Sequence, residues 1–277
     1  MRSYYREKLW KTFLYVTLLG VIVWNNFPLF WTIISSIKPE REIHSIPPTL
    51  MATRFTLEHY EKVLSETFLL RSLANSALVA ICTALATIAV SGMAAYGLSR
   101  FRFTFKNQTR QMLFTFYMFP QVMLGLSFAR IFVPVGLYDT LAGLVVAHLT
   151  LTIPFCTLIL WPFFDAIPTE IDQAAMIDGC SRLQAFFTVI LPCALRGVIT
   201  TGVFAFILSW NEFTYSLFIL RSLDNRTASL MLSDLIRMQE IGVRWPQLLP
   251  ATVLVTVPAV VAFMLIEERL VKGLGAI

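Results

Sequence analysis

Charged side chains are scarce in this 277-residue chain: Asp, Glu, Lys and Arg make up 14% of it, and hydrophobic residues make up 57%. A soluble domain of this length does not need so much apolar sequence, and here the apolar residues are grouped. Stretches of about 20 residues with little or no charge recur, which is the length that a helix needs to cross the hydrocarbon core of a bilayer. The sequence therefore predicts an all-α membrane protein with six transmembrane helices, formed as one domain over residues 1–277.

Sequence motifs of enzymes are also lacking. No G-x-x-x-x-G-K-[ST] phosphate loop is present, so the chain is not expected to bind or hydrolyse ATP itself. Neither G-x-S-x-G nor H-E-x-x-H occurs. The four cysteines have no metal-like or disulfide-like spacing, and the three histidines are isolated. We therefore expect no catalytic residue, no metal and no cofactor in this chain.

The first apolar run follows a basic N-terminal tail, as a signal peptide would. However, the run from residue 12 to residue 37 is too long for the core of a signal peptide and has no small-residue cleavage site. We expect it to remain as the first span. The predicted spans cover residues 12–37, 73–98, 111–132, 140–164, 197–220 and 245–266.

The distribution of Lys and Arg predicts the orientation. The N-terminal tail and the connector from Arg100 to Arg110 each hold four basic residues in about eleven positions. With six spans, both segments lie on the same side as the C-terminus and the segment 167–192. Because short cytoplasmic loops are rich in Lys and Arg, we expect that side, with both termini, to be cytoplasmic.

The segment 167–192 differs from the apolar runs on either side of it. Thr169 and Asp172 have the spacing of a capping box, and Gly179 is placed to end this first helix in a left-handed conformation. Ser181 with Gln184 predicts a second capped helix, which a proline ends at position 192. A stiff pair of short helices suits insertion into a groove on another protein. The alternative is a surface connector that only joins two spans.

This segment resembles the EAA loop of ABC importer permeases, whose pattern is roughly E-A-A-x-x-D-G-A, five residues, then F-x-x-I-x-L-P. The positions that match in register are Ala174, Ala175, Asp178, Gly179, Phe186, Leu191 and Pro192. Gln173 replaces the glutamate, Cys180 the alanine and Val189 the isoleucine, and we expect the fold of the loop to survive these changes. The resemblance implies a coupling helix docked on a cytoplasmic ATPase subunit. The ATPase-coupling residues that it implies are Gln173, Ala174, Ala175, Asp178, Gly179, Phe186 and Pro192.

Glu212 is the one acidic residue well inside a predicted span, where a charged side chain exposed to lipid would cost several kcal/mol. It must therefore face the bundle interior, an aqueous cavity or a partner. Two interpretations remain open: Glu212 locks helices together, or it lines a translocation path with Asn211 beside it. Gln121, next to a proline, is a further path candidate. His148 is expected to be a hydrogen-bonded packing residue.

The whole chain resembles the carbohydrate branch of ABC importer permeases, and in particular the shorter permease subunit of maltose-type importers. The residues that carry this resemblance are Ser36 to Pro39, Asn75-Ser76, Ala94 to Tyr96 before Arg100, Trp210 to Phe213, and Val271 to Leu274. Arg196 stands where that branch often has a proline.

The resemblance implies an ATP-driven importer of a mono- or oligosaccharide or a related polyol. In it this chain forms half of the path beside a homologous permease, with two ATPase subunits that bind ATP and an external solute-binding protein. A glycerol-phosphate or other polar metabolite remains an alternative substrate. An ion-coupled secondary transporter is a second alternative, but it would need an internal repeat, and we find none.

Overall fold

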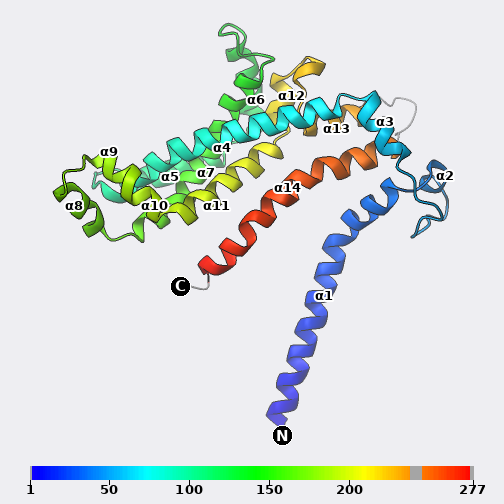
Figure 1. The fold of residues 1–277 in the computed structure, drawn as a ribbon, viewed down its shortest axis with the longest axis horizontal. Helices are drawn as coiled ribbons and strands as arrows, with labels where there is room; N and C mark the ends of the chain where they lie inside the picture. The colour runs from blue at the N-terminus through cyan, green and yellow to red at the C-terminus, as the bar shows by residue number, and fades with distance from the viewer. Residues whose placement is uncertain (1, 238–244, 275–277) are drawn as a thin grey trace. The chain divides into compact units, whose positions relative to one another are not determined.

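The computed structural model describes the backbone of residues 2–237 and 245–274, and their side chains except those of residues 2–6, 66 and 265–274. The resemblance in the tail, at Val271 to Leu274, therefore lies outside the described side chains. The described residues form helices and no strand (Figure 1). The chain divides into two compact units, residues 1–67 with 235–254 and residues 68–234 with 255–277. The single-domain organisation stays a prediction.

The helices of the first part of the chain are α1 (Arg2–Ser36), α2 (Glu40–Ile43), α3 (Glu58–Glu66), α4 (Leu69–Arg100), α5 (Lys106–Tyr117), α6 (Gln121–Phe132) and α7 (Leu141–Asp165). Those that follow are α8 (Thr169–Ile177), α9 (Arg182–Ala185), the π-helical turn η1 (Phe186–Ile190), α10 (Leu191–Cys193), α11 (Leu195–Trp210), α12 (Thr214–Ile219), the 3₁₀ turn η2 (Leu223–Asn225), α13 (Ala228–Arg237) and α14 (Trp245–Leu274).

Among the described residues, four helices are long and apolar enough to cross a membrane, and two bent helix pairs raise the number to as many as six. The four coincide with the predicted spans 12–37, 73–98, 140–164 and 245–266. The predicted span 111–132 corresponds to one of the bent pairs, in which α5 ends at Tyr117 and α6 begins at Gln121 after a bend of 83°. Pro120 has no N–H to donate and disfavours a helical conformation at the residue before it, which breaks the helix there.

The predicted span 197–220 is also interrupted. Helix α11 begins at Leu195 and ends at Trp210, and the chain resumes a helix only at Thr214. In the other direction, α11 meets the second helix of the 167–192 segment at Ala194 with a bend of 84°. A continuous apolar run in the sequence therefore corresponds to two helices with a polar break between them.

The centre of the larger unit is formed by α4, α7 and α11, which run side by side (Figure 1). The buried hydroxyls of Thr87 in α4 and Thr152 in α7 lie 2.7 Å apart and satisfy one another. Two glycines let α11 approach its neighbours. A Cβ added at Gly202 would lie 2.6 Å from Ile88 Cδ1, and one at Gly197 would lie 2.5 Å from Phe163 Cγ. Small residues at such contacts are typical of membrane helix packing.

In the smaller unit, Lys38 holds the segment that follows α1 in place, and this residue is only 2% exposed. Its Nζ lies 4.5 Å from the ring centroid of Trp31 and donates a hydrogen bond to the carbonyl of Thr49. His59 Nε2, in α3, lies 3.0 Å from the Lys38 carbonyl oxygen.

Candidate functional site

The segment 167–192 folds as a corner between α8 and α9, as the glycine and the second capping box predict. Gly179 has φ +92°, which is the left-handed region that favours glycine, and it follows Asp178 at the end of α8. The Ser181 hydroxyl accepts from the N–H of Gln184, and the Gln184 side chain accepts from the N–H of Ser181. Both ends of this corner are therefore set by local sequence.

The prediction of a first capping box, formed by Thr169 with Asp172, is wrong. Helix α8 begins at Thr169 after Pro168, and no side chain caps it. The Asp172 carboxylate is instead buried against α4. The Tyr96 hydroxyl donates to its Oδ1 at 2.7 Å, and Arg100 Nε donates to its Oδ2 at 2.6 Å. A charge-assisted bond of this length is one of the stronger polar contacts in proteins.

Arg100 also holds the end of α7. Its Nη1 donates to the Phe164 carbonyl at 3.0 Å and its Nη2 to the Ile167 carbonyl at 2.9 Å. The Phe164 carbonyl lies in the last turn of α7, where the final C=O groups have no partner within the helix and attract a cation, and the Ile167 carbonyl lies in the turn that follows. The guanidinium therefore joins the end of α4, the end of α7 and the start of α8.

An aromatic cluster lies beneath this polar junction. The rings of Tyr96, Phe164 and Phe186 have centroid separations between 4.9 and 6.0 Å, and each residue is at most 8% exposed. Phe186 and Ala175, two of the predicted ATPase-coupling residues, are thus interior residues that attach the corner to the bundle. They cannot offer their side chains to a partner without local rearrangement.

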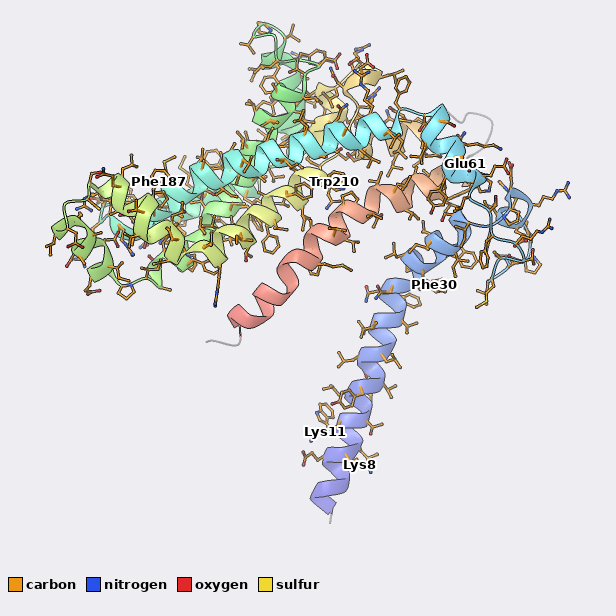
Figure 2. All side chains as sticks on the ribbon, viewed as in Figure 1. Lys8, Lys11, Phe30, Glu61, Phe187 and Trp210 are labelled. Carbon is orange, nitrogen blue, oxygen red and sulfur yellow. The ribbon has the colours of Figure 1, made fainter. Side chains whose placement is uncertain are left out.

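The other predicted coupling residues lie on the surface: Gln173, Ala174, Asp178, Gly179 and Pro192. Three large apolar side chains of the same segment are also exposed, Ile177 at 85%, Leu183 at 61% and Phe187 at 52%. Phe187 is labelled in Figure 2. We call Gln173, Ala174, Ile177, Asp178 and Leu183 the corner face. Apolar side chains exposed on a rigid corner are typical of a docking surface.

The sequence did not predict the hydrogen bonds from Tyr96 and Arg100, in α4, to the Asp172 carboxylate. Tyr96 and Arg100 are four residues apart and so lie on one face of α4, at the end of a span. That spacing was the available signal. Nothing in the sequence, however, assigns Asp172 to them, since it lies 72 residues beyond Arg100 along the chain.

Glu212 caps the break between α11 and α12. Its Oε1 accepts from the N–H of Tyr215 at 2.7 Å and its Oε2 from the N–H of Ser216 at 3.2 Å. His148 Nε2, from α7, lies 3.2 Å from Oε2, and its Nδ1 lies 2.6 Å from the Ser209 hydroxyl. His148 is buried and hydrogen-bonded, as predicted. These contacts favour the helix-locking interpretation of Glu212.

The structure does not bring the three path candidates together. Asn211 is exposed and Gln121 is half-buried at the start of α6, whereas Glu212 is only 6% exposed. An apolar cavity of about 520 Å³ lies beside the break between α5 and α6, and none of the three residues lines it. A path role for Glu212, Asn211 and Gln121 stays a prediction. In the described part of the chain no three His, Cys, Asp or Glu residues are grouped as metal ligands.

The fold is that of an ABC importer permease. A chain of a bacterial ABC transporter involved in the import of the acidic polysaccharide alginate matches with a TM-score of 0.79 and 18% identity, over 93% of this chain and 95% of that one. A second alginate transporter structure, in complex with a periplasmic protein that holds an alginate pentasaccharide, matches with a TM-score of 0.66 and 13% identity, over 93% and 92%.

The chain belongs to the family described as the inner membrane component of binding-protein-dependent transport systems, which it matches over residues 87–274. It is 31% identical to the inner membrane ABC transporter permease protein YcjP of Escherichia coli, over 95% of this chain and 94% of that protein. It is 33% identical to the sulfoquinovosyl glycerol permease protein SmoH of Agrobacterium fabrum, over 92% and 89%. Identity to the trehalose/maltose permease protein MalG of Thermococcus litoralis is 30%, over 90% of each.

Proposed function

We propose that this chain is the permease subunit of an ATP-driven importer for a carbohydrate, a mono- or oligosaccharide or a related polyol. The similar proteins SmoH and MalG are named for sulfoquinovosyl glycerol and trehalose/maltose, which supports a sugar or sugar-like substrate. Glycerol-phosphate or another polar metabolite is the alternative within the same class of importer. An ion-coupled secondary transporter is the alternative outside it.

The observation that carries the proposal is the corner face, exposed on one side and fastened to the bundle on the other. The partner for this face is an ATPase subunit, which binds the ATP, so the permease itself needs no cofactor. Two ATPase subunits, a homologous permease and an external solute-binding protein complete the transporter. The corner and both termini then face the cytoplasm, in keeping with the basic residues near the N-terminus and after α4.

Coupling follows from the stiffness of the junction at Arg100. Movement of the corner is passed to the ends of α4 and α7, because Asp172 and the Phe164 and Ile167 carbonyls share one guanidinium. A well-packed junction of this kind moves as a rigid body rather than deforming. Alternating access of the path between the two permeases would result.

Reconstitution tests this function. The chain is placed in proteoliposomes with the partner subunits encoded beside it, and uptake of labelled di- and oligosaccharides is measured with the solute-binding protein outside. We expect uptake that requires ATP inside and is insensitive to collapse of the ion gradients. Uptake driven by an ion gradient without ATP would refute the proposal. Uptake of a glycerol-phosphate but of no sugar would keep the assignment as an ATP-driven importer and refute the carbohydrate substrate.

A further inference from the structure

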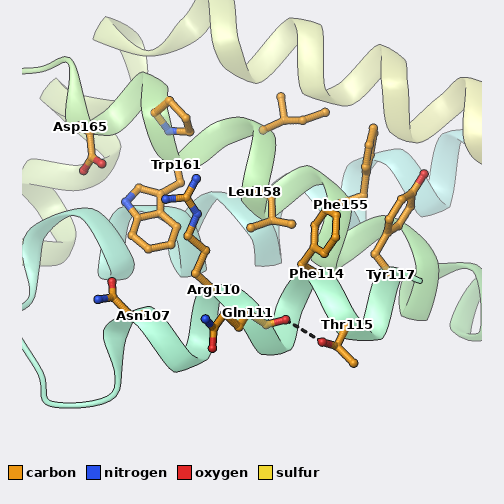
Figure 3. A pocket seen from close by; sticks show the side chains of 12 residues that line it. Asn107, Arg110, Gln111, Phe114, Thr115, Tyr117, Phe155, Leu158, Trp161 and Asp165 are labelled. Atoms are coloured by element: carbon orange, nitrogen blue, oxygen red, sulfur yellow. Dashed lines mark hydrogen bonds between the residues drawn. The ribbon is translucent and has the colours of Figure 1, made fainter. Parts of the chain in front are cut away.

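A pocket of about 1100 Å³ lies between α5 and α7 in the larger unit, and the coupling mechanism leaves it without a role (Figure 3). Arg110, near the start of α5, lies over the ring of Trp161 near the end of α7. Tyr117, at the end of α5, stacks on Phe155 earlier in α7, so the two helices run in opposite directions. One end of the pocket therefore lies beside the corner, and the other lies deeper in the bundle.

The lining combines polar groups of several kinds. They are two amides, two hydroxyls and one charge of each sign: Asn107, Gln111, Thr115, Tyr117, Arg110 and Asp165. Gln111 and Thr115 are exposed, although they belong to an apolar helix pair that can cross a membrane. Polar side chains at such a depth face water or another protein chain rather than lipid. This side of the bundle is therefore suited to an aqueous path.

The lining carries no net charge, because Arg110 is the basic residue in it and Asp165 the acidic one. Asp165 accepts a hydrogen bond from the Ser99 hydroxyl at 2.6 Å, and the amides of Asn107 and Gln111 can each donate and accept. An ion would meet a like charge as well as an opposite one here. A neutral ligand with many hydroxyl groups can form hydrogen bonds with all of these side chains, so the lining favours such a ligand.

The deeper end of the pocket adds aromatic rings. Phe114 and Tyr117 come from α5 and Phe155 from α7, and the ring centroids of Tyr117 and Phe155 are 4.9 Å apart. A sugar ring presents C–H groups on its faces, which pack against aromatic rings, and hydroxyl groups around its edge. The pocket offers surfaces for both. The apolar cavity beside the break between α5 and α6 does not, since Thr150 is the one polar residue that lines it.

We propose that this pocket is the inner part of the translocation path and binds a neutral saccharide on its way to the cytoplasm. The sugar hydroxyls bond to Asn107 and Gln111, and the sugar faces pack against Phe114 and Tyr117. The volume of about 1100 Å³ is just above the range of about 300–1,000 Å³ for small-molecule sites, which leaves room for a di- or oligosaccharide. The inference rests on the proposed function for its orientation, and it goes beyond that function in assigning the residues and a substrate without charge.

Two glutamines of α5 provide a matched test. Gln111 lines the pocket, whereas Gln108 is also exposed but lies outside the lining. ATP-driven uptake of maltose, trehalose and glycerol 3-phosphate is measured in proteoliposomes for Gln111→Leu and Gln108→Leu. We expect Gln111→Leu to slow saccharide uptake about fivefold at subsaturating concentration, as for the loss of one neutral hydrogen bond. Gln108→Leu should transport as the wild type does.

Cysteine labelling from the cytoplasmic side tests the pocket directly. In the starting protein serine replaces Cys82, Cys180 and Cys193, whereas the buried Cys156 stays. Gln111→Cys and the control Gln108→Cys are treated with a membrane-impermeant maleimide in inside-out vesicles, and the labelled complex is then purified and reconstituted. We expect labelling at position 111 to block uptake, and maltose or trehalose to slow that labelling. Labelling at position 108 should do neither.

Three results would overturn the proposal. A position 111 that the maleimide does not reach would lie under lipid or the partner permease, and labelling there without an effect on uptake would place the pocket off the path. Protection by neither saccharide, or stronger protection by glycerol 3-phosphate, would refute a neutral saccharide as the ligand.

Uptake by the unlabelled protein separates these results from failure of the proposed function. If ATP-driven saccharide uptake is intact, a negative labelling result refutes the pocket assignment alone. Uptake driven by an ion gradient would refute the importer, and the labelling at position 111 would still decide whether the pocket lies on the path.

Discussion

Arg100 Nε, at the last residue of α4, lies 2.6 Å from Asp172 Oδ2 in α8, and the two side chains are 5% and 7% exposed. This buried pair connects segments 72 residues apart and is the polar core of the junction beneath the corner. The corner is therefore fixed to the membrane bundle partly through Asp172, a residue that is not among the positions that match the EAA-loop pattern.

Replacing Asp172 with Ala should loosen the junction, because it leaves the Arg100 charge buried without its carboxylate. The breaking of a buried pair costs about 3–5 kcal/mol. We expect a marked drop in the thermal unfolding temperature of the purified complex, together with ATP hydrolysis that no longer drives uptake. Asp178→Ala, a loss of the same charge from an exposed position on the corner, should leave the unfolding temperature within the error of the measurement.

A double-mutant cycle with Arg100→Ala checks the pair itself. If the effects of Asp172→Ala and Arg100→Ala on stability simply add, the two side chains are not coupled and the junction does not act as one unit.

Substitutions at Asp178, on the corner face, and at the adjacent Gly179 should leave the bundle folded but prevent ATP hydrolysis from driving uptake. Charge reversal at Asp178 places a cation on the exposed surface, and Gly179→Val forces a β-branched residue into a backbone with φ +92°. Nothing lies within 4 Å of a Cβ at position 179, so the cost there is one of backbone conformation, about 1–2 kcal/mol. We expect an assembled bundle and little uptake in both variants.

Gly179→Asn provides the control for this experiment, since Asn adopts the left-handed conformation more readily than Val. It should keep more uptake than Gly179→Val. Full uptake in the Asp178→Lys and Gly179→Val proteins would contradict a coupling role for the corner.

Glu212→Gln tests the cap of α12. The amide keeps one oxygen acceptor but loses the charge, and with it the charge-assisted bonds to the N–H groups of Tyr215 and Ser216. We expect a loss of about 1–2 kcal/mol in the free energy of unfolding, in the range for loss of a helix cap. Asn211→Ala, at the neighbouring exposed position, should leave stability unchanged. A Glu212→Gln protein that is as stable as the wild type but has an altered KM for uptake would favour the path role instead.

The loop between α6 and α7 should respond to acid through Asp139. Burial alone would raise the pKa of this carboxyl, but the N–H groups of Arg221 and Ser222 and the Ser222 hydroxyl donate to it, and together they lower the pKa below the ordinary value of 3.8. A lowered pKa in the folded state means that the ionised form stabilises the fold at pH values above 3.8. This stabilisation is lost as the pH falls through the lower, folded-state value.

Asp139→Asn removes this titration without straining the backbone, since φ at position 139 is +57° and Asn tolerates that region. The wild type should unfold at a higher temperature than the variant at pH 6, and the difference should shrink as the pH falls below about 4. Thermal unfolding in detergent over this pH range measures it. A difference that stays constant with pH would show that the charge does not contribute.

Much of this architecture follows from the sequence alone. Apolar runs longer than a bilayer crossing determine α1, α4, α7 and α14, and local chemistry determines the corner, because a glycine in a left-handed conformation and a reciprocal Ser181–Gln184 cap act over only a few residues. Hydropathy could not show the breaks after Tyr117 and Trp210. An apolar run has the same mean hydropathy whether its helix is continuous or interrupted. The first break is set locally by Pro120, whereas the second depends on partners such as His148 for Glu212, the side chain that caps α12.

Only the tertiary structure decided that Asp172 binds Tyr96 and Arg100 rather than capping its own helix, and that Phe186 faces inward. A carboxylate has several possible donors along the chain. The one that it binds is set by which helices lie side by side, and that arrangement depends on packing between residues that are far apart in the sequence.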